Sequence, residues 1–313
     1  MQTMAPMKRL IRPENPRPID ITPRDEDMMS FVARTGLATS DQIARFVGGS
    51  EKNLGERLKL LFWHQYLNRP EQQRTHLALF PDLGNVPLIY ALGSAGKKHL
   101  AMRGLHTRKQ SRAKAPLLAH NIATAETVLA FALASRADGA PRLLDDADLL
   151  PLMPEATRML QDPFRFRVTV RDRAKDITLN VVPDRLLSLV YADNHRHNFC
   201  LEVDLGTMTI AARRNGHIHL TGKSTFARKH AGFFNGWNEG KHRTQWGWQG
   251  FRVLTVAPSE ARISHMIDAQ REIAKGASAL FLYTTPTRMA AHGAFAPIWI
   301  SSESDGISII DRK

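Results

Sequence analysis

Start and stop signals for three short helices lie close together near the N-terminal end of the chain, and they constrain its fold more than any other feature. Residues 22–36 begin with Thr-Pro and an acidic first turn and end at a glycine, which is the pattern of a capped helix. Residues 39–49 begin with a capping-box spacing and end at two glycines, and Ser50 then precedes a third helix over residues 51–66. Three helices of this size with short joints predict a helix-turn-helix.

Short strand-like pieces follow the third helix. Residues 67–70, 75–80 and 87–92 are interrupted by Pro and Gly, as the strands of a wing are, and a further helix follows them. We therefore predict a winged helix-turn-helix domain over residues 22–104. The segments that flank this domain are a flexible, proline-containing N-terminal arm, residues 1–21, and a basic linker, residues 105–116.

The third predicted helix carries leucines on one side and polar, mostly basic residues on the other. Lysine and arginine favour guanine edges in the major groove of DNA, and asparagine favours adenine edges. We therefore predict that this helix contacts duplex DNA, with an ordinary solvated helix face as the alternative. The predicted DNA-binding residues are Lys52, Asn53, Glu56, Arg57 and Lys59 on this helix, Lys97 and Lys98 on the next, and Arg108 and Lys109 in the linker.

Charge is distributed unevenly along the chain, which has a net charge of +13. Lys and Arg outnumber Asp and Glu by 19 to 10 in residues 1–116 and by 14 to 7 in residues 206–313, but residues 117–205 carry 10 against 13. Basic regions favour a polyanion such as DNA through counterion release, and the alternative is a solvated basic surface. The acidic middle region is a candidate cation site.

The composition excludes several classes of protein. No apolar run approaches the roughly 20 residues of a membrane span, and the start of the chain lacks an uninterrupted apolar signal core. The single cysteine, Cys200, excludes an internal disulfide and lies in an apolar strand-like run, as buried thiols do. We therefore expect a cytoplasmic protein without a membrane partner.

From residue 117 onward, a long helix is followed by strands and helices. Glu126 lies on the apolar stripe of the long helix, and a carboxylate on a core-facing stripe needs a partner or a metal ion. The dipeptide Asn215-Gly216 predicts a hairpin turn. The order of elements predicts an α/β fold, α+β for the chain overall. Strands are predicted at residues 165–170, 177–182, 185–191, 198–205, 251–258 and 279–285, and helices at residues 117–137, 223–237 and 259–275.

Three carboxylates follow one another on two of these strands. Asp184 begins one strand, while Glu202 and Asp204 lie two residues apart on the next and therefore share a face. If the strands pair, clustered carboxylates repel one another unless a cation compensates, and hard oxygen ligands select Mg²⁺ or Mn²⁺. We therefore predict a metal site at Asp184, Glu202 and Asp204 that activates water at a scissile phosphate. The alternatives are an ordinary strand entry and a salt-bridged strand end.

The chain resembles the replication-relaxation proteins of plasmids and other mobile elements. The resemblance is carried by ITPRDEDMMSFVARTGLATSDQIARFV, IYALGSAGKKHL, HNIATAETVLAFAL, PDRLLSL and FCLEVDLGT. It implies a winged helix-turn-helix domain followed, over residues 117–313, by a restriction-endonuclease-like domain of the PD-(D/E)xK nuclease type with a central mixed sheet. It also implies a role in plasmid replication or mobilisation. Its implied catalytic positions are Asp184, Glu202 and Glu126.

One position departs from the nuclease pattern. An active nuclease of this type has a lysine two residues after the glutamate, where it positions water and stabilises the transition state, and Asp204 cannot do this. Lys229, on the helix predicted at residues 223–237, is a candidate replacement at the edge of that helix's core side. The alternative is a surface lysine with a buried stem.

Three hypotheses follow for the function. The first is sequence-specific DNA binding with weak or lost nuclease activity. The second is an active metal-dependent endonuclease or nickase that uses Asp184, Glu202 and Lys229, and the third is a transcriptional autoregulator. The expected partners are double-stranded DNA, other replication or mobilisation proteins, and a second copy of the chain.

Two further patterns leave alternatives open. The His-x-His pairs at residues 195–197 and 217–219 have the spacing of transition-metal ligands, but such pairs are more typical of polar hairpin faces. The three tryptophans within residues 237–248 lie among basic residues, which suits either stacking on unpaired bases or a packed loop.

Overall fold

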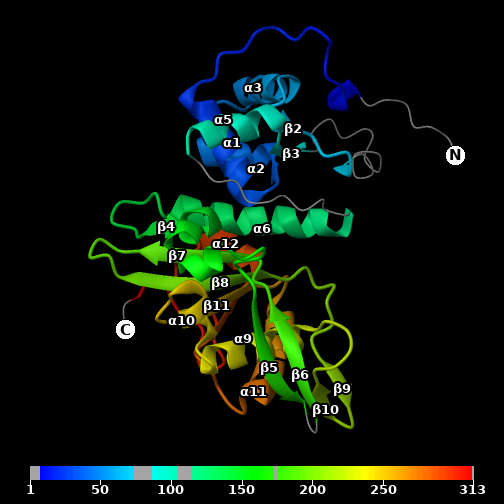
Figure 1. The fold of residues 1–313 in the computed structure, drawn as a ribbon, viewed down its shortest axis with the longest axis vertical. Helices are drawn as coiled ribbons and strands as arrows, with labels where there is room; N and C mark the ends of the chain where they lie inside the picture. The colour runs from blue at the N-terminus through cyan, green and yellow to red at the C-terminus, as the bar shows by residue number, and fades with distance from the viewer. Residues whose placement is uncertain (1–7, 74–86, 105–114, 173–174, 312–313) are drawn as a thin grey trace, which may run out of the picture. The chain divides into compact units, whose positions relative to one another are not determined.

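The chain folds into two compact units. The computed structural model describes residues 8–73, 87–104, 115–172 and 175–311 (Figure 1). The units comprise Met1–Leu129 and Ala130–Lys313, and each contains a sheet of its own. None of the helices in the described ranges combines the length and apolar character that a membrane crossing needs.

The first unit consists of short helices around a small antiparallel sheet with strand order β1-β3-β2. The three helices predicted within residues 22–66 and the further helix predicted after residue 92 are confirmed. The strands predicted around residues 67–70 and 87–92 are also confirmed. The strand predicted at residues 75–80 lies outside the described residues. In chain order the elements are η1 (Lys8–Leu10), α1 (Pro23–Thr35), β1 (Ala38–Thr39), α2 (Ser40–Val47), α3 (Glu51–Trp63), β2 (Leu67–Asn68), β3 (Ile89–Leu92) and α5 (Ser94–Met102).

Local capping forms the first two helices as the sequence predicts. The hydroxyl of Thr22 accepts the backbone N–H of Asp25, and the Asp25 carboxylate accepts the N–H of Thr22 in return. Thr39 and Gln42 form the same reciprocal pair at the start of α2. These contacts join residues only three positions apart, so the local sequence is sufficient to predict them.

The apolar side of α3 belongs to the core of the first unit. Leu54, Leu58 and Leu61 are buried, as predicted. The helix ends at Trp63, three residues earlier than predicted, because Gln65 has a φ of 61°. This left-handed conformation is incompatible with a continuing right-handed helix.

Two glycines let α5 approach the turn after α3 closely. A Cβ atom at Gly93 would lie 2.0 Å from the carbonyl oxygen of Gln65, and one at Gly96 would lie 2.2 Å from that of Tyr66. The N–H of Gly93 donates to the Tyr66 carbonyl at 2.9 Å. Any larger side chain at these positions would therefore push β3 and α5 away from this turn.

The second unit is built on a five-stranded sheet with the order β12-β11-β8-β7-β4. Strands β8, β11 and β12 are parallel, whereas β7 and β4 are antiparallel to their neighbours. The predicted α/β class with a mixed central sheet is therefore confirmed. The strands are β4 (Arg142–Leu144), β7 (Arg185–Val190), β8 (Arg196–Val203), β11 (Arg252–Val256) and β12 (Phe281–Thr284).

Helices and two hairpins complete the second unit, and helix α6 (Ala115–Ala134) runs across the division between the units. The hairpin predicted at Asn215-Gly216 is confirmed, with φ values of 52° and 79°. The short elements β4, α7, η2, α8, α10 and α12 were not predicted, because three to seven residues with no turn or periodic signal of their own show no clear pattern. The remaining elements are α7 (Asp146–Leu149), η2 (Leu150–Leu152), α8 (Glu155–Arg158), β5 (Phe166–Asp172), β6 (Lys175–Val181), β9 (Ala212–Arg214), β10 (His217–His219), α9 (Phe226–Asn238), α10 (Lys241–Trp246), α11 (Glu260–Ala274) and α12 (Pro286–His292).

The core of the second unit lies between one face of the sheet and helices α9 and α11. Cys200 of β8 is fully buried there, as predicted, together with Phe233 of α9 and Met266 of α11. Trp246 and Trp248 are buried in the same core, with ring centroids 4.9 Å apart. The burial of these two rings agrees with the packed-loop interpretation, whereas the third tryptophan, Trp237, is 37% exposed.

Candidate functional site

The pairing of β7 with β8 brings the two acidic motifs together. The strands are antiparallel with Arg185 opposite Leu201, and Asp184 immediately precedes this ladder. The N–H of Asp184 donates to the Leu201 carbonyl at 3.0 Å, and the Asp184 carboxylate accepts the N–H of Val203 at 2.8 Å. Asp184 is thereby attached to both neighbours of Glu202.

Glu202 is buried near the end of β8, and the ammonium group of Lys229 forms an ion pair with its Oε2 atom. The exposed fraction is 7% for the Glu202 side chain and 33% for that of Lys229. Burial disfavours the ammonium charge, but the carboxylates of Glu202, Asp184 and Asp204 outweigh it and raise the pKa of Lys229. Lys229 is therefore charged at neutral pH.

The loop after β8 positions the first turn of α9, which carries Lys229. The carbonyl groups of Thr209 and Ile210 accept the first two N–H groups of this helix, at 3.1 and 2.8 Å. The first N–H groups of a helix have no partner within it. The two hydrogen bonds therefore tie the helix start to the loop and hold Lys229 near Glu202.

Asp204, the third predicted metal ligand, is held by Arg262 of α11. The Arg262 guanidinium donates to both carboxylate oxygens, from Nε to Oδ2 and from Nη2 to Oδ1 at 3.0 Å. Arg262 also donates to the carbonyl of Met208, and the N–H of Gly206 donates to Asp204 at 3.0 Å. Arg262 is not predictable from the sequence, because its partner is 58 residues away and no local pattern connects the two residues.

The predicted three-carboxylate metal site is not assembled. Within the described ranges, no group of three or more His, Cys, Asp or Glu side chains is placed to hold a metal ion. The Asp204 carboxylate binds Arg262, the Glu202 carboxylate pairs with Lys229, and the Asp184 carboxylate accepts the N–H of Val203. Two carboxylates suit Mg²⁺ only where substrate phosphates and water complete its octahedral shell.

Glu126 finds its partners in helix α2 of the first unit. Arg45 forms a two-pronged ion pair with it, including Nη1 to Oε1 at 2.7 Å, and the Gln42 amide donates to Oε2 at 3.1 Å. Burial raises the pKa of Glu126, but these hydrogen bonds outweigh burial and lower the pKa below its usual value. The partner that this carboxylate was predicted to need is therefore a side-chain pair that joins α6 to α2.

The predicted DNA-binding face of α3 is partly engaged in contacts within the chain. Lys59 lies 3.4 Å from Glu56 and 4.8 Å from the centroid of the Trp63 ring, while Asn53 is exposed. On α5, Lys97 and Lys98 are both exposed. The Lys52 side chain and the whole of Arg108 and Lys109 lie outside what the structure describes.

Arg57, also predicted to bind DNA, forms an ion pair with Asp25 of α1. The Asp25 side chain is completely buried, and Arg57 Nε donates to its Oδ1 at 2.6 Å. Burial acts to raise the pKa of Asp25, but hydrogen bonds from Arg57 and Thr22 outweigh it and lower the pKa. The guanidinium of Arg57 therefore compensates a buried charge in the first unit.

The described part of the N-terminal arm contacts α3. The Arg12 guanidinium lies 4.3 Å from the centroid of the Phe62 ring and donates to the Phe62 carbonyl at 2.7 Å. The imidazole of His64 donates to the Arg17 carbonyl at 2.8 Å, and the Arg17 side chain approaches Glu56 at 3.9 Å. These contacts place residues of the arm beside the face that was predicted to meet DNA.

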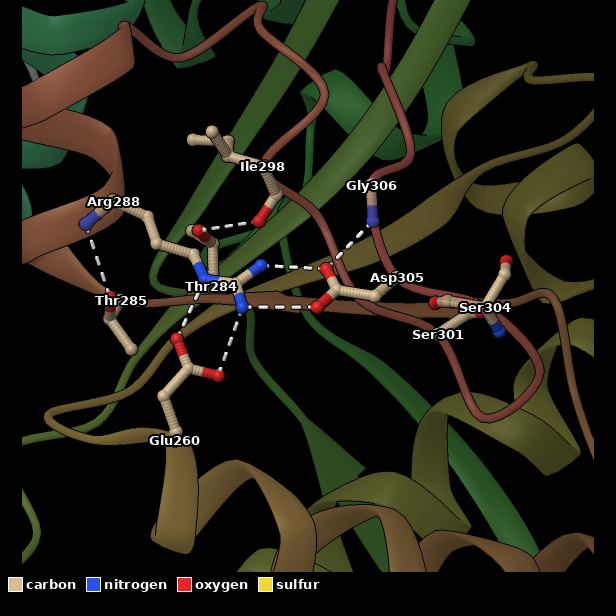
Figure 2. Close-up of polar contacts among 9 residues, drawn as sticks. All are labelled: Glu260, Thr284, Thr285, Arg288, Ile298, Ser301, Ser304, Asp305 and Gly306. Carbon is tan, nitrogen blue, oxygen red and sulfur yellow. Dashed lines mark hydrogen bonds and ion pairs between the residues drawn. The ribbon is translucent and has the colours of Figure 1, made fainter.

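A second ion-pair network lies at the C-terminal end of β12, in the second unit (Figure 2). Arg288 of α12 binds Glu260 of α11 and Asp305 of the C-terminal segment, with closest distances of 2.6 Å to each. The Thr284 hydroxyl donates to the carbonyl of Ile298 at 3.0 Å. The network attaches the C-terminal segment to the edge of the sheet.

A known protein family matches most of this chain. The family model described as replication-relaxation matches residues 29–234, a range that includes Asp184, Glu202 and Lys229. No curated protein and no solved structure matches the chain.

Proposed function

The chain belongs to the replication-relaxation family, and on this premise we propose that it is a DNA-binding protein that acts in the replication or relaxation of a plasmid or another mobile element. Its first unit binds duplex DNA as a winged helix-turn-helix. Its second unit is a PD-(D/E)xK nuclease-like domain whose centre has weak or lost activity. Other replication or mobilisation proteins and a second copy of the chain are further proposed partners.

The observation that carries this proposal is the topology of the first unit. Helices α2 and α3 are joined by the three residues 48–50, and the sheet that follows has the order β1-β3-β2. A winged helix-turn-helix consists of a helix, a strand, two helices with a tight joint, and two antiparallel strands. Such domains place the second helix of the pair in the major groove.

The contacts within the first unit refine the set of residues that bind DNA. Asn53 is exposed on α3 and suits base recognition, whereas Arg57 is committed to the buried Asp25 and serves the fold. Lys97 and Lys98 are exposed and suit phosphate contacts, which supply most of the salt-dependent affinity for DNA.

Fluorescence anisotropy with duplexes from the element's own replication region tests the proposal. For Lys97→Ala/Lys98→Ala, we expect the slope of log affinity against log salt to fall by about 1.8, because each lost phosphate contact contributes about 0.9. For Asn53→Ala, we expect the preference for the best site over other sequences to fall by about 1–3 kcal/mol. Lys175→Ala, at an exposed lysine of β6, is the control and should change neither quantity. Identical salt slopes for all variants would overturn the proposed interface.

The ion pair of Lys229 supports weak or lost activity at the nuclease-like centre. Neighbouring carboxylates require a compensating cation, and the ammonium group of Lys229 already provides one beside Glu202. Asp204 is likewise compensated, by Arg262. The centre therefore has internal charge compensation and does not need a metal ion in order to fold.

A second candidate function, a metal-dependent endonuclease or nickase, is favoured by the same lysine. Lys229 lies at Glu202 and within electrostatic reach of Asp184, so the three residue types of a PD-(D/E)xK centre are close together. For this function, Asp184 and Glu202 would hold Mg²⁺ or Mn²⁺, which would polarise the scissile phosphate and activate water. Lys229 then stabilises the charge that develops on the phosphate oxygens.

Incubation of supercoiled DNA with the protein and Mg²⁺ or Mn²⁺ separates the two functions. Our first proposal predicts no nicked or linear product. Metal-dependent cutting that is lost in Asp184→Asn, Glu202→Gln and Lys229→Gln, but retained in the control Lys223→Ala, would establish the endonuclease instead. The substitutions keep side-chain size, and circular dichroism would verify that each variant is folded.

A further inference from the structure

The second unit has a groove between the loop that follows β8 and helix α11. Its volume is about 580 Å³, and it is lined by residues 206–211 of the loop, Arg213 of β9, and Arg262, His265 and Asp268 of α11. A volume of this size lies within the range of roughly 300–1,000 Å³ that is typical of small-ligand sites. This 206–211 groove is large enough for one nucleotide and too small for a duplex.

Hydrogen bonds hold both ends of the loop, so the groove is formed without a ligand. At one end, Gly206 bonds to Asp204, and Arg262 bonds to both Asp204 and the carbonyl of Met208. At the other end, the carbonyls of Thr209 and Ile210 accept N–H groups from the start of α9. A preformed site loses little conformational entropy when a ligand binds.

The polar part of the lining suits an anion. Arg262 uses Nε and Nη2 for Asp204 and Met208, and its Nη1 amino group makes no hydrogen bond to any part of the chain that the structure describes. Arg213 is 47% exposed and forms an ion pair with Glu272, which lies outside the lining, and His265 is exposed on α11. These groups face a single acid in the lining, Asp268. A guanidinium fixed by a carboxylate is a typical partner for phosphate oxygens.

The rest of the lining suits a base. Met208, Ile210 and Ala211 from the loop contribute apolar surface, opposite Ala269 of α11. Methionine adapts its shape to flat or irregular partners. A ligand that has a phosphate at one end and a flat, weakly polar ring at the other is therefore complementary to this groove.

The position of the groove connects it to the candidate centre. Asp204, which holds Arg262, is two residues from Glu202, and the loop that forms one wall also anchors the helix start that carries Lys229. The groove lies beyond the carboxyl end of β8, where ligands of open α/β sheets bind. The groove and the candidate centre are therefore joined through the same loop and the same arginine.

We propose that the 206–211 groove binds one unpaired nucleotide of a DNA strand, with its phosphate on Arg262 and its base against Met208 and Ile210. The proposal rests on the DNA-binding function proposed above and adds a site for single-stranded DNA to it. Duplex DNA binds through the first unit, and the second unit holds a strand that has been separated locally.

Binding of a short fluorescein-labelled oligothymidylate to the full-length protein tests this site. Arg262→Gln removes the phosphate partner, and His265→Glu adds a negative charge to the lining at an exposed position where folding is not at risk. We expect Arg262→Gln to weaken binding by about tenfold, the effect of losing one charge-assisted hydrogen bond. His265→Glu should weaken binding by a similar factor, because the new carboxylate repels the phosphate. Ser264→Glu adds the same charge at the neighbouring position of α11, which is exposed and outside the groove, and should leave binding unchanged.

Crosslinking and competition locate the occupant. An oligonucleotide that contains 5-bromodeoxyuridine should crosslink to a peptide within residues 206–213. Thymidine monophosphate should compete with the oligonucleotide at concentrations at which inorganic phosphate does not. Equal competition by inorganic phosphate would overturn the assignment of a nucleotide, and equal affinity of His265→Glu and Ser264→Glu for the oligonucleotide would overturn the site.

The outcomes remain distinct from those of the function proposed above. If the protein binds duplex DNA but not the oligonucleotide, the groove proposal fails and the winged helix-turn-helix proposal stands. If Lys97→Ala/Lys98→Ala changes nothing while His265→Glu weakens oligonucleotide binding, the reverse holds. His265→Glu should not affect duplex binding.

Discussion

The ammonium group of Lys229 in α9 and the carboxylate of Glu202 in β8 form an ion pair across 27 residues of sequence. The pair joins a helix start to the end of a central strand, beside Asp184. It places a basic residue next to a buried glutamate, two residues before Asp204. The pair therefore compensates the charge of the buried Glu202 carboxylate.

Replacing Lys229 with methionine should leave the buried Glu202 carboxylate without its cation. We expect Lys229→Met to lower the free energy of unfolding by about 1–3 kcal/mol, because a charge-assisted hydrogen bond is lost while the charge stays buried. Most of this loss should be recovered in Lys229→Met/Glu202→Gln. Urea denaturation followed by circular dichroism measures both effects.

A surface pair provides the control for this prediction. Arg171 and Asp176 form an ion pair of which both members are mostly exposed. Arg171→Met should therefore change the free energy of unfolding by less than about 0.5 kcal/mol. A loss of the same size in Lys229→Met and Arg171→Met would contradict a stabilising role for the buried pair.

His230, the next residue along α9, should make stability depend on pH. Its imidazole is fully buried against Phe226 and Phe281, and burial lowers its pKa from 6.5 to about 3. Between these values the unfolded chain binds a proton that the folded chain does not. Stability should therefore fall as the pH falls from 6.5 toward 3, by up to about 1.4 kcal/mol per pH unit.

His230→Phe checks this prediction, because phenylalanine preserves the aromatic contacts and cannot take up a proton. Thermal melting across this pH range should show a weaker pH dependence in the variant than in the parent. A control substitution, His265→Gln, changes an exposed histidine on α11 and should keep the dependence of the parent. Parallel curves for His230→Phe and the parent would exclude His230 as the source.

We expect Arg57 to stabilise the fold of the first unit rather than to contact DNA. Arg57→Ala leaves the fully buried Asp25 carboxylate uncompensated, and we expect a loss of about 3–5 kcal/mol in the free energy of unfolding. Lys59→Ala, at a more exposed position of the same helix, should have little effect on stability. Differential scanning calorimetry measures both. Equal melting temperatures for the two variants would show that Arg57 is free to serve DNA recognition.

The same pair predicts an acid transition. The pKa of Asp25 is lowered in the folded chain by hydrogen bonds from Arg57 and Thr22, which outweigh its burial. Its contribution to stability is therefore complete above the ordinary aspartate pKa of about 3.9 and is lost as the pH falls through the lower folded value. The loss of stability from Asp25 therefore occurs at lower pH than most of the loss from His230, which takes place between pH 6.5 and 3. Melting temperatures measured at several pH values separate the two contributions, because Asp25 lies in the first unit and His230 in the second.

Arg288 should hold the C-terminal segment against the sheet, because it binds Glu260 and Asp305 at once (Figure 2). In Arg288→Ala we expect faster amide hydrogen exchange in residues 298–307, with little change in the strands β8 and β11. Arg196→Ala, at an exposed arginine of β8, is the control. Unchanged exchange in this segment would show that backbone contacts alone retain it.

Interactions between neighbouring residues were predictable from the sequence of this protein. Two capping boxes and one hairpin turn involve residues at most three positions apart in sequence. They are the pairs Thr22 with Asp25 and Thr39 with Gln42, and the turn at Asn215-Gly216. The leucine face of α3 follows from the helical period alone. Backbone sterics and periodic burial act locally, so these features needed no knowledge of the remaining chain.

Only the tertiary structure decided the partners of the charged residues. Asp204 was predicted as a metal ligand, and its carboxylate binds Arg262. Glu126 was predicted as a catalytic residue, and its carboxylate binds Arg45. Arg57 was predicted as a DNA contact, and its guanidinium binds Asp25. These partners are 58, 81 and 32 residues away in sequence. A buried charge must be compensated, and the sequence shows that need. Which residue compensates it depends on how helices and strands pack, and no local pattern contains that information.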